Sequence, residues 1–524
     1  MNGTPAHAIL AIAATLVFCS CVRTAPKEFA FSEVTVGGEL HERIDRNFRR
    51  LESDVYLPDR VFRNDDWPGD FVGRTILGTV LASQASHRPP QYLREILDSL
   101  PEHFNGRGYL GPDWGDVIDE QQLSGHGWLL RGLCEYYELT GDADVLEYIR
   151  GIASNLFLPA KGRFATYPID PALRPSGVGA ESGTITQTSD GWRLSSDIGC
   201  VFIGMAGLIH ANTVLDDPQI AEVIDEMVDR FAQIDLVEIK AQTHASLTAA
   251  RSLLRLYEQT GRRDCLRLAR KVWDTYTEHG MTCNFENFNW FDRTDTWTEP
   301  CAIIDSYILS YNLWRFTRRR EYRDWAELIY YNAICHTQRH NGGFGCDNCP
   351  DEDDPYIRVH ANEAWWCCTM RGGEGLARVA RSSWLHRGRK LFIPFFRESE
   401  LKAEGVHLIE HSNYPFSDLV EIEVVSNDGG YNRLELPVLW WSANSLLLVN
   451  GKLTSLQGGV LRRRLRPGDK LTITAPNSGY TTVTPQGKCL FKGPLMLSPE
   501  DGKPLYHMMD STVRRGSYSR KAIY

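Results

Sequence analysis

The sequence lacks any apolar run long enough to cross a bilayer. Its most apolar stretch, residues 8–18, falls short of the roughly 20 residues that a membrane helix needs. Apolar residues make up 42% of the 524 positions and charged residues 24%, which is ordinary for a globular protein. A polytopic membrane protein, a collagen and a disordered chain are therefore excluded, and the length predicts two to four domains.

Positive charge is also scarce, because 57 Lys and Arg residues stand against 67 Asp and Glu residues, for a net charge of −10. No basic patch stands out, so we expect no nucleic-acid partner. The 14 tryptophans and 21 tyrosines are a mild indication of sugar binding, since their rings stack on sugar faces. Core packing explains most of them equally well.

Cysteine is too rare, at 13 residues, for a disulfide scaffold. The four that stand singly in helical-looking sequence are expected to be small buried hydrophobic residues. Cys346 and Cys349 lie three positions apart, which suits a disulfide in an exported protein or a second metal site. The four single cysteines are Cys134, Cys200, Cys265 and Cys335.

The first 21 residues are interpreted as a signal peptide or lipoprotein signal, because a short apolar segment ends in Phe18-Cys-Ser-Cys21. Cys21 would then carry the lipid, although the segment before residue 8 has no Lys or Arg. We expect an exported protein that is periplasmic, anchored to the outer membrane or extracellular. Membrane attachment is expected only through such a lipid, and the oligomeric state stays open.

Residues 30–385 show helical periodicity in a recurring unit, which is a helix, a Thr-Gly turn and a second helix. Clear copies surround Gly141 and Gly261, where glycine supplies the helix stop. Helical hairpins must stack to bury their apolar faces. So many of them predict a closed (α/α) barrel, a fold whose loops form a site at one end.

The period changes to two over residues 386–490, where short alternating segments are separated by turn signals such as Asn450-Gly451. Short, regularly spaced strands predict a β-sandwich. Residues 491–524 have little pattern and are expected to form a C-terminal tail. The predicted strands cover residues 390–396, 419–425, 433–437, 445–449 and 470–474.

Two short motifs carry chemistry: Glu299-Pro-Cys301, and the vicinal pair Cys367-Cys368. Three thiolates and one carboxylate are a normal ligand set for tetrahedral zinc. The sulfurs of such a site should lie roughly 3.5–4 Å apart. A vicinal disulfide or a buried cysteine pair explains the second motif as well.

With these motifs and others, the chain resembles the β-L-arabinofuranosidases of glycoside hydrolase family 127, the former DUF1680 group. The resemblance runs from about Asp66 into the predicted β-sandwich, and the order and approximate spacing of its marks agree. These marks are Ser124-Gly-His126, Tyr136 to Gly141, Gln242-Thr-His-Ala245, Glu299-Pro-Cys-Ala302, Tyr330-Tyr-Asn332, Cys367-Cys368, Leu376 to Val379, Leu391 to Pro394, Val449-Asn-Gly451 and Arg466 to Asp469.

The resemblance implies an (α/α)₆ barrel followed by a β-sandwich, and an oligo- or polysaccharide substrate. It implies a Zn²⁺ ion held by Glu299, Cys301, Cys367 and Cys368, with Cys367 as the nucleophile. The glutamate just upstream, Glu286, takes the place of the acid/base. Asp292 and Asp295 in the same loop are the fallback positions.

Two histidines at predicted helix starts, His126 and His244, match positions that the family places in the sugar pocket. Buried histidines whose hydrogen bonds are satisfied within the core would explain these positions as well. Gln122, with Asp119 and Glu120, precedes His126 and is expected to bind sugar hydroxyls or to cap the helix. Trp67, Trp365 and Trp366 are candidate stacking platforms or core residues.

The implied chemistry is coherent on general grounds. Zinc keeps a cysteine as thiolate, which would attack the anomeric carbon while a protonated glutamate assists the leaving oxygen. Water then completes a second displacement, so the configuration is retained.

The chain departs from the family in having Thr369 to Gly373 after the cysteine pair, where many members carry prolines. The Cys346–Cys349 segment looks private to a subgroup, and we expect it not to complete the zinc site. Two alternatives stay open: another toroid activity such as a lyase or epimerase, and a non-catalytic sugar-binding surface protein with structural zinc.

Overall fold

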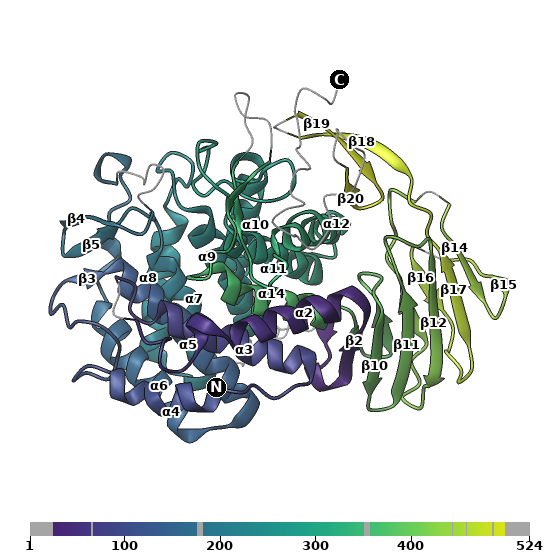
Figure 1. Ribbon diagram of the computed structural model, residues 1–524, viewed down its shortest axis with the longest axis horizontal. Coiled ribbons are helices and arrows are strands. Elements are labelled where there is room, and N and C mark those ends of the chain that lie inside the picture. Colours follow the sequence, from purple (N-terminus) through teal and green to yellow (C-terminus); the bar gives the residue numbers. More distant parts are fainter. Residues whose placement is uncertain are drawn as a thin grey trace, which may run out of the picture.

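The computed structural model describes residues 25–63, 66–174, 182–349, 357–442, 444–456, 458–484 and 487–497 (Figure 1). The predicted signal segment 1–21, and residues 498–524 of the predicted tail, lie outside these ranges. Within them, no helix has both the length and the apolar character that a membrane span needs.

Six helices pack in a closed ring, because each contacts the next along the chain and the last contacts the first. They are buried around most of their circumference, as expected for helices enclosed by others. In chain order they are α3 (Asp70–Ser86), α5 (Glu120–Thr140), α7 (Val201–Leu215), α9 (Thr243–Thr260), α11 (Pro300–Thr317) and α14 (Cys368–Arg381).

A second set of helices packs on the outside of this ring and is amphipathic. In α10, for example, Cys265, Ala269 and Val272 are buried at helical spacing while the opposite side faces solvent. The outer helices are α2 (Gly38–Leu51), α4 (Leu93–Ser99), α6 (Ala143–Ile152), α8 (Pro218–Ala232), α10 (Arg263–His279) and α12 (Arg320–Ile329).

The predicted Thr-Gly helical hairpins are confirmed. Gly141 ends α5 with φ 69° and Gly261 ends α9 with φ 75°, the left-handed conformation that glycine adopts without strain. The four single cysteines are buried, as expected, and all cysteines in the described part of the chain are free thiols.

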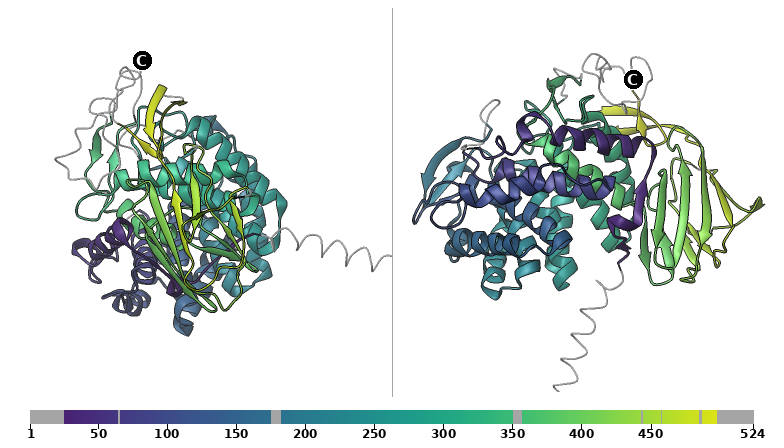
Figure 2. Two further views of the ribbon diagram at one scale, coloured as in Figure 1. Left: turned by 90° about the vertical axis from the view of Figure 1, so that its right-hand side faces the viewer. Right: turned by 60° about the horizontal axis from the view of Figure 1, so that its bottom comes forward.

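The C-terminal part is rich in sheet and lies beside the helical part (Figures 1 and 2). All five predicted strand segments contain strands. Burial alternates along β12, where Val420, Ile422 and Val424 point inward. The seven-stranded sheet has the order β15 (Lys452–Leu453), β14 (Leu446–Val449), β17 (Lys470–Thr474), β12 (Leu419–Ser426), β11 (Val406–Ser412), β10 (Ser399–Ala403) and β2 (Val34–Val36).

Two further sheets complete this part. The five-stranded sheet has the order β1 (Lys27–Glu28), β8 (Leu385–Arg387), β9 (Lys390–Phe392), β13 (Arg433–Glu435) and β16 (Val460–Arg462), and the three-stranded sheet contains β18 (Gly479–Thr484), β19 (Gly487–Lys492) and β20 (Leu495–Met496).

The predicted boundaries differ from these sheets in two places. Strand β1 pairs with β8, and β2 pairs with β10, so residues 27–28 and 34–36 belong to the C-terminal sheets although they precede the helices. Strands β19 and β20 extend the sheet structure past residue 490. Both differences come from pairing across long sequence separations, which period alone does not reveal.

The ring helices approach one another at glycines. A Cβ atom on Gly127 of α5 would lie 2.4 Å from the carbonyl oxygen of Ile203 in α7, and one on Gly207 of α7 would lie 2.3 Å from that of Gly127. Backbones this close leave no room for a side chain, so these positions fix the spacing of the ring.

We expect Gly127→Ala to destabilise the fold by about 1–3 kcal/mol, the usual cost of overpacking, because backbone atoms of α7 must move. Thermal unfolding followed by circular dichroism measures the change. Gly151→Ala in α6 is the matched control, since its Cβ would meet nothing closer than 3.9 Å. Equal melting temperatures for the two variants would refute the close-packing argument.

Candidate active site

A cavity of about 620 Å³ opens at the end of the ring where the helices begin. The first turns of α3, α7, α9 and α14 line it, with the N-cap residue of α11. Segments that follow β5 (Trp192–Ser195) and accompany β7 (Val359–Ala361) complete the lining. Helix N-termini carry partial positive charge. The cavity is therefore suited to negative groups.

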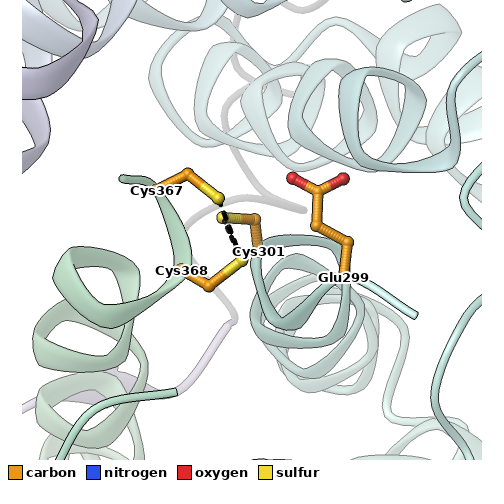
Figure 3. A group of neighbouring side chains, drawn as sticks. All are labelled: Glu299, Cys301, Cys367 and Cys368. Carbon is orange, nitrogen blue, oxygen red and sulfur yellow. Dashed lines mark hydrogen bonds between the residues drawn. The ribbon is translucent and has the colours of Figure 1, made fainter. Parts of the chain in front are cut away.

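Four side chains lie close together: Glu299, Cys367 and Cys368, which line the cavity, and Cys301, which is fully buried beside them (Figure 3). One ligand atom from each lies within 4.8 Å of the others. The Sγ atoms of Cys301 and Cys368 are 3.6 Å apart, and those of Cys367 and Cys368 are 3.1 Å apart. The cysteines are free thiols, so the vicinal disulfide is not formed.

The sequence folds to this geometry because the residues stand at helix starts. Glu299 is the N-cap of α11, with Pro300 and Cys301 in its first turn. Cys367 is the N-cap of α14 and Cys368 is its first residue. Two neighbouring helix ends thus present all four donors.

Two polar groups hold the cluster. The Arg74 guanidinium donates to the sulfur of Cys301 at 3.3 Å and is itself fixed by Asp70 at 2.6 Å. His244 Nδ1 lies 3.0 Å from an oxygen of Glu299. Burial alone would raise the pKa of Glu299, but His244 and Arg74 hold it below its ordinary value.

These residues fit a metal ion. Sulfur and carboxylate donors in this number suit a tetrahedral site, and one carboxylate oxygen of Glu299 is buried with no hydrogen-bond partner. Burial raises the pKa of the Cys301 and Cys368 thiols well above the ordinary value. A bound cation would reverse that shift and hold thiolates.

The predicted sugar-binding residues divide into two groups. His244 lines the cavity, but His126 and Gln122 do not. His126 is fully buried, with Nε2 accepting from the Leu110 amide at 3.0 Å and Nδ1 lying 2.8 Å from the Gln122 carbonyl. Burial lowers its pKa to about 4, so the ring stays neutral. This is the environment of a satisfied core histidine.

The side-chain amide of Gln122 donates to the backbone carbonyls of Leu110 and Pro112. Asp119 caps α5, because its carboxylate accepts from the backbone amide of Gln122. Glu120 forms a buried ion pair with Arg174. The polar groups of this segment therefore have partners within the protein, and none of the three residues lines the cavity.

The aromatic candidates also divide. Trp67 and Trp366 line the cavity, and Trp366 is 48% exposed. Trp365 instead packs edge-on against Phe71, beneath the Arg63 guanidinium. Trp297, stacked on His360 with ring centroids 5.1 Å apart, lines the cavity too.

Glu286 does not line the cavity. Its carboxylate is fully buried in a separate group with His336 and Asp347. Of the fallback positions, Asp292 pairs with His279 at the surface and Asp295 lines the cavity while held by Arg293 at 2.6 Å.

Asp197, which follows β5 and lines the cavity, was not predicted, because no motif marks it. It is 4% exposed and accepts hydrogen bonds from the Ser182 hydroxyl at 3.0 and 3.2 Å. It takes part in no ion pair with the described residues. Burial and the charge of Glu299 raise its pKa to about 7.

Cys346 lines the cavity next to Cys368, whereas Cys349 lies behind it with its sulfur 3.5 Å from the Asn287 carbonyl. Both are free thiols, so they form no disulfide with each other. Neither belongs to the group of four donors.

Residues 62–381 match the family model described as the β-L-arabinofuranosidase, GH127 catalytic domain. A solved GH127 β-arabinofuranosidase is 13% identical, covers 91% of this chain and 85% of its own, and has a TM-score of 0.67. The GH127 β-L-arabinofuranosidase Ara127N from Geobacillus stearothermophilus T6 is 15% identical, with coverages of 88% and 86% and a TM-score of 0.66. Such likeness shows a shared fold. The comparison with curated proteins gave no match.

We expect Cys301→Ser and Cys368→Ser each to lose one equivalent of bound metal, because each removes one of four donors. Elemental analysis of the purified protein measures it. Cys349→Ala and Cys200→Ser, which remove buried thiols outside the four-donor group, should keep that equivalent. Loss in Cys349→Ala but not in Cys368→Ser would reassign the ligands.

Proposed function

The chain belongs to glycoside hydrolase family 127, and on this premise we propose that it is an exported, retaining, β-L-arabinofuranosidase-like glycosidase with a cysteine nucleophile. Its substrate is a carbohydrate, as the family implies. The closed ring of six helices, with its outer helices, supports an (α/α)₆ barrel, and the large sheets support a β-sandwich. Export rests on the signal-like residues 1–21.

The observation that carries this proposal is that Cys301, Cys367, Cys368 and Glu299 lie together, and that three of them, Glu299, Cys367 and Cys368, line a cavity of sugar size. Cys367 is the one cysteine of the three that is partly exposed. In a closed structural site all ligands are shielded from solvent, whereas here the partly exposed Cys367 lines an open cavity. The arrangement therefore favours catalysis over the non-catalytic alternative.

Zinc, when bound by these four side chains, would supply a positive charge that keeps the sulfurs as thiolates. The protein contributes the rest of the environment. Arg74 donates to Cys301, and the N-termini of α11 and α14 stabilise negative charge on the neighbouring sulfurs. Cys367 is thereby left to face the substrate.

In the first displacement the Cys367 sulfur attacks the anomeric carbon and the bond to the leaving oxygen breaks. A carboxylic acid gives its proton to that oxygen. In the second, water attacks the same carbon, the carbon–sulfur bond breaks and the carboxylate takes the proton of the water. Two inversions give net retention.

We assign the carboxylic acid to Asp197 rather than to Glu286. Asp197 lines the cavity, has no cation partner among the described residues and is oriented by Ser182. Glu286 has the expected sequence position, but its carboxylate lies outside the cavity lining. His244 and Trp366 are the side chains proposed to contact the sugar hydroxyls and ring face.

Cys367→Ser should fold like the wild type and lose turnover of aryl furanosides on the order of a thousandfold or more, the scale of losing a nucleophile. An alkoxide is far less available than a thiolate. Initial rates on a panel of aryl furanosides, with and without chelator, measure it. Cys200→Ser is the matched control and should keep its activity. Full activity in Cys367→Ser would contradict the thiolate mechanism.

Asp197→Asn should slow substrates with poor leaving groups by roughly 10²–10⁴, the usual share of acid catalysis, and activated aryl substrates much less. Rates plotted against leaving-group pKa report the difference. Glu286→Gln and the surface control Asp292→Asn should keep the wild-type slope. If Glu286→Gln steepens the slope and Asp197→Asn does not, the two roles are reversed.

A further inference from the structure

A second group of potential metal ligands lies outside the cavity lining. Glu286 comes from the loop after α10, His336 from the short helix α13 (Cys335–Thr337) and Asp347 from strand β6 (Cys346–Asp347). One ligand atom from each lies within 4.8 Å of the others. His336 is 2% exposed, and the two carboxylates are fully buried.

Glu286 is the feature that an ordinary core does not explain. Both of its carboxylate oxygens are buried and neither has a hydrogen-bond partner. A buried carboxylate without compensation costs several kcal/mol or more. A second carboxylate, Asp347, stands in the same group, so the group calls for positive charge at its centre.

Arg339 supplies one positive charge, which acts on both carboxylates but forms an ion pair with Asp347. Its Nη2 lies 3.4 Å from Asp347 Oδ1 and also donates to the backbone carbonyls of Cys346 and Ala361. The other oxygen, Asp347 Oδ2, lies 3.4 Å from His336 Nε2, and Glu286 Oε1 lies 3.9 Å from the same nitrogen. Three donors from different segments of the chain thus lie close together.

We propose that Glu286, His336 and Asp347 bind a second divalent cation. One imidazole and two carboxylates suit a borderline ion such as Zn²⁺, Mn²⁺ or Fe²⁺, whereas the sulfur cluster suits a softer one. Donor atoms that share an ion at about 2.0–2.2 Å lie roughly 3–4 Å apart. The nitrogen of His336 lies at such distances from an oxygen of each carboxylate.

The second ion would brace the segment that carries the first site. Asn287, next to Glu286, accepts the Glu299 amide proton at 2.8 Å. Asp347 and Thr298 exchange two bonds, at 2.7 Å through the Thr298 amide and 2.9 Å through the Thr298 hydroxyl. Asp347 and the neighbour of Glu286 therefore hold Thr298 and Glu299, the two residues just before α11.

The test is the metal content of the full-length protein after removal of loosely bound ions. We expect two equivalents in the wild type and one in Glu286→Gln and His336→Gln. Each of these should retain the equivalent that Cys368→Ser loses. His210→Gln is the matched control, because His210 is also a buried histidine 2.9 Å from a carboxylate, that of Glu138. It should keep two equivalents.

Cobalt substitution keeps the test decisive if a variant fails to fold. Wild-type protein loaded with two Co²⁺ should show thiolate charge-transfer absorption from one ion, and Cys368→Ser should retain a Co²⁺ with d–d bands but no thiolate absorption. A single equivalent in the wild type, lost in Cys368→Ser and kept in Glu286→Gln, would overturn the second site. Neither readout depends on glycosidase activity.

Discussion

The gathering of three sulfurs and one carboxylate at the starts of two helices is the constraint on which the site depends. Four donors that carry negative charge when a metal binds are placed together where α11 and α14 begin, beside Arg74. Helix N-termini and a guanidinium lower the cost of that placement. The ring of six helices is what brings residues 299–301 and 367–368 to one place.

Next to the four-donor cluster, the interior of the helical ring holds charged side chains rather than only apolar ones. The Arg74 and Arg371 guanidiniums lie 4.2 and 4.4 Å from the ring centroid of Trp128, and His244 stacks on the same ring. Arg371 pairs with Asp305 at 2.5 Å, and Asp305 lies 3.7 Å from His244 Nε2. Loss of one member would leave a buried charge unpaired, so the cluster and the core are coupled.

Local patterns predicted the helical hairpins, the strand segments and the single buried cysteines, because period, Thr-Gly turns and residue size act over short distances. The family resemblance brought Glu299 together with the three cysteines. Position along the chain does not reveal that His126 bonds to backbone partners or that Glu286 is buried outside the cavity lining. It also gave no hint of Asp197, which reaches the cavity only through the fold of β5 and its neighbours.

Direct capture of the sugar on the enzyme tests the central claim. Wild-type protein would be quenched in acid during turnover of an activated aryl β-L-arabinofuranoside and analysed by intact mass and peptide mapping. We expect a mass increase of one pentosyl residue, located on Cys367, because a thioglycoside survives the quench. A sugar attached to another side chain, or none under conditions where the burst of aryl alcohol is complete, would contradict the cysteine nucleophile.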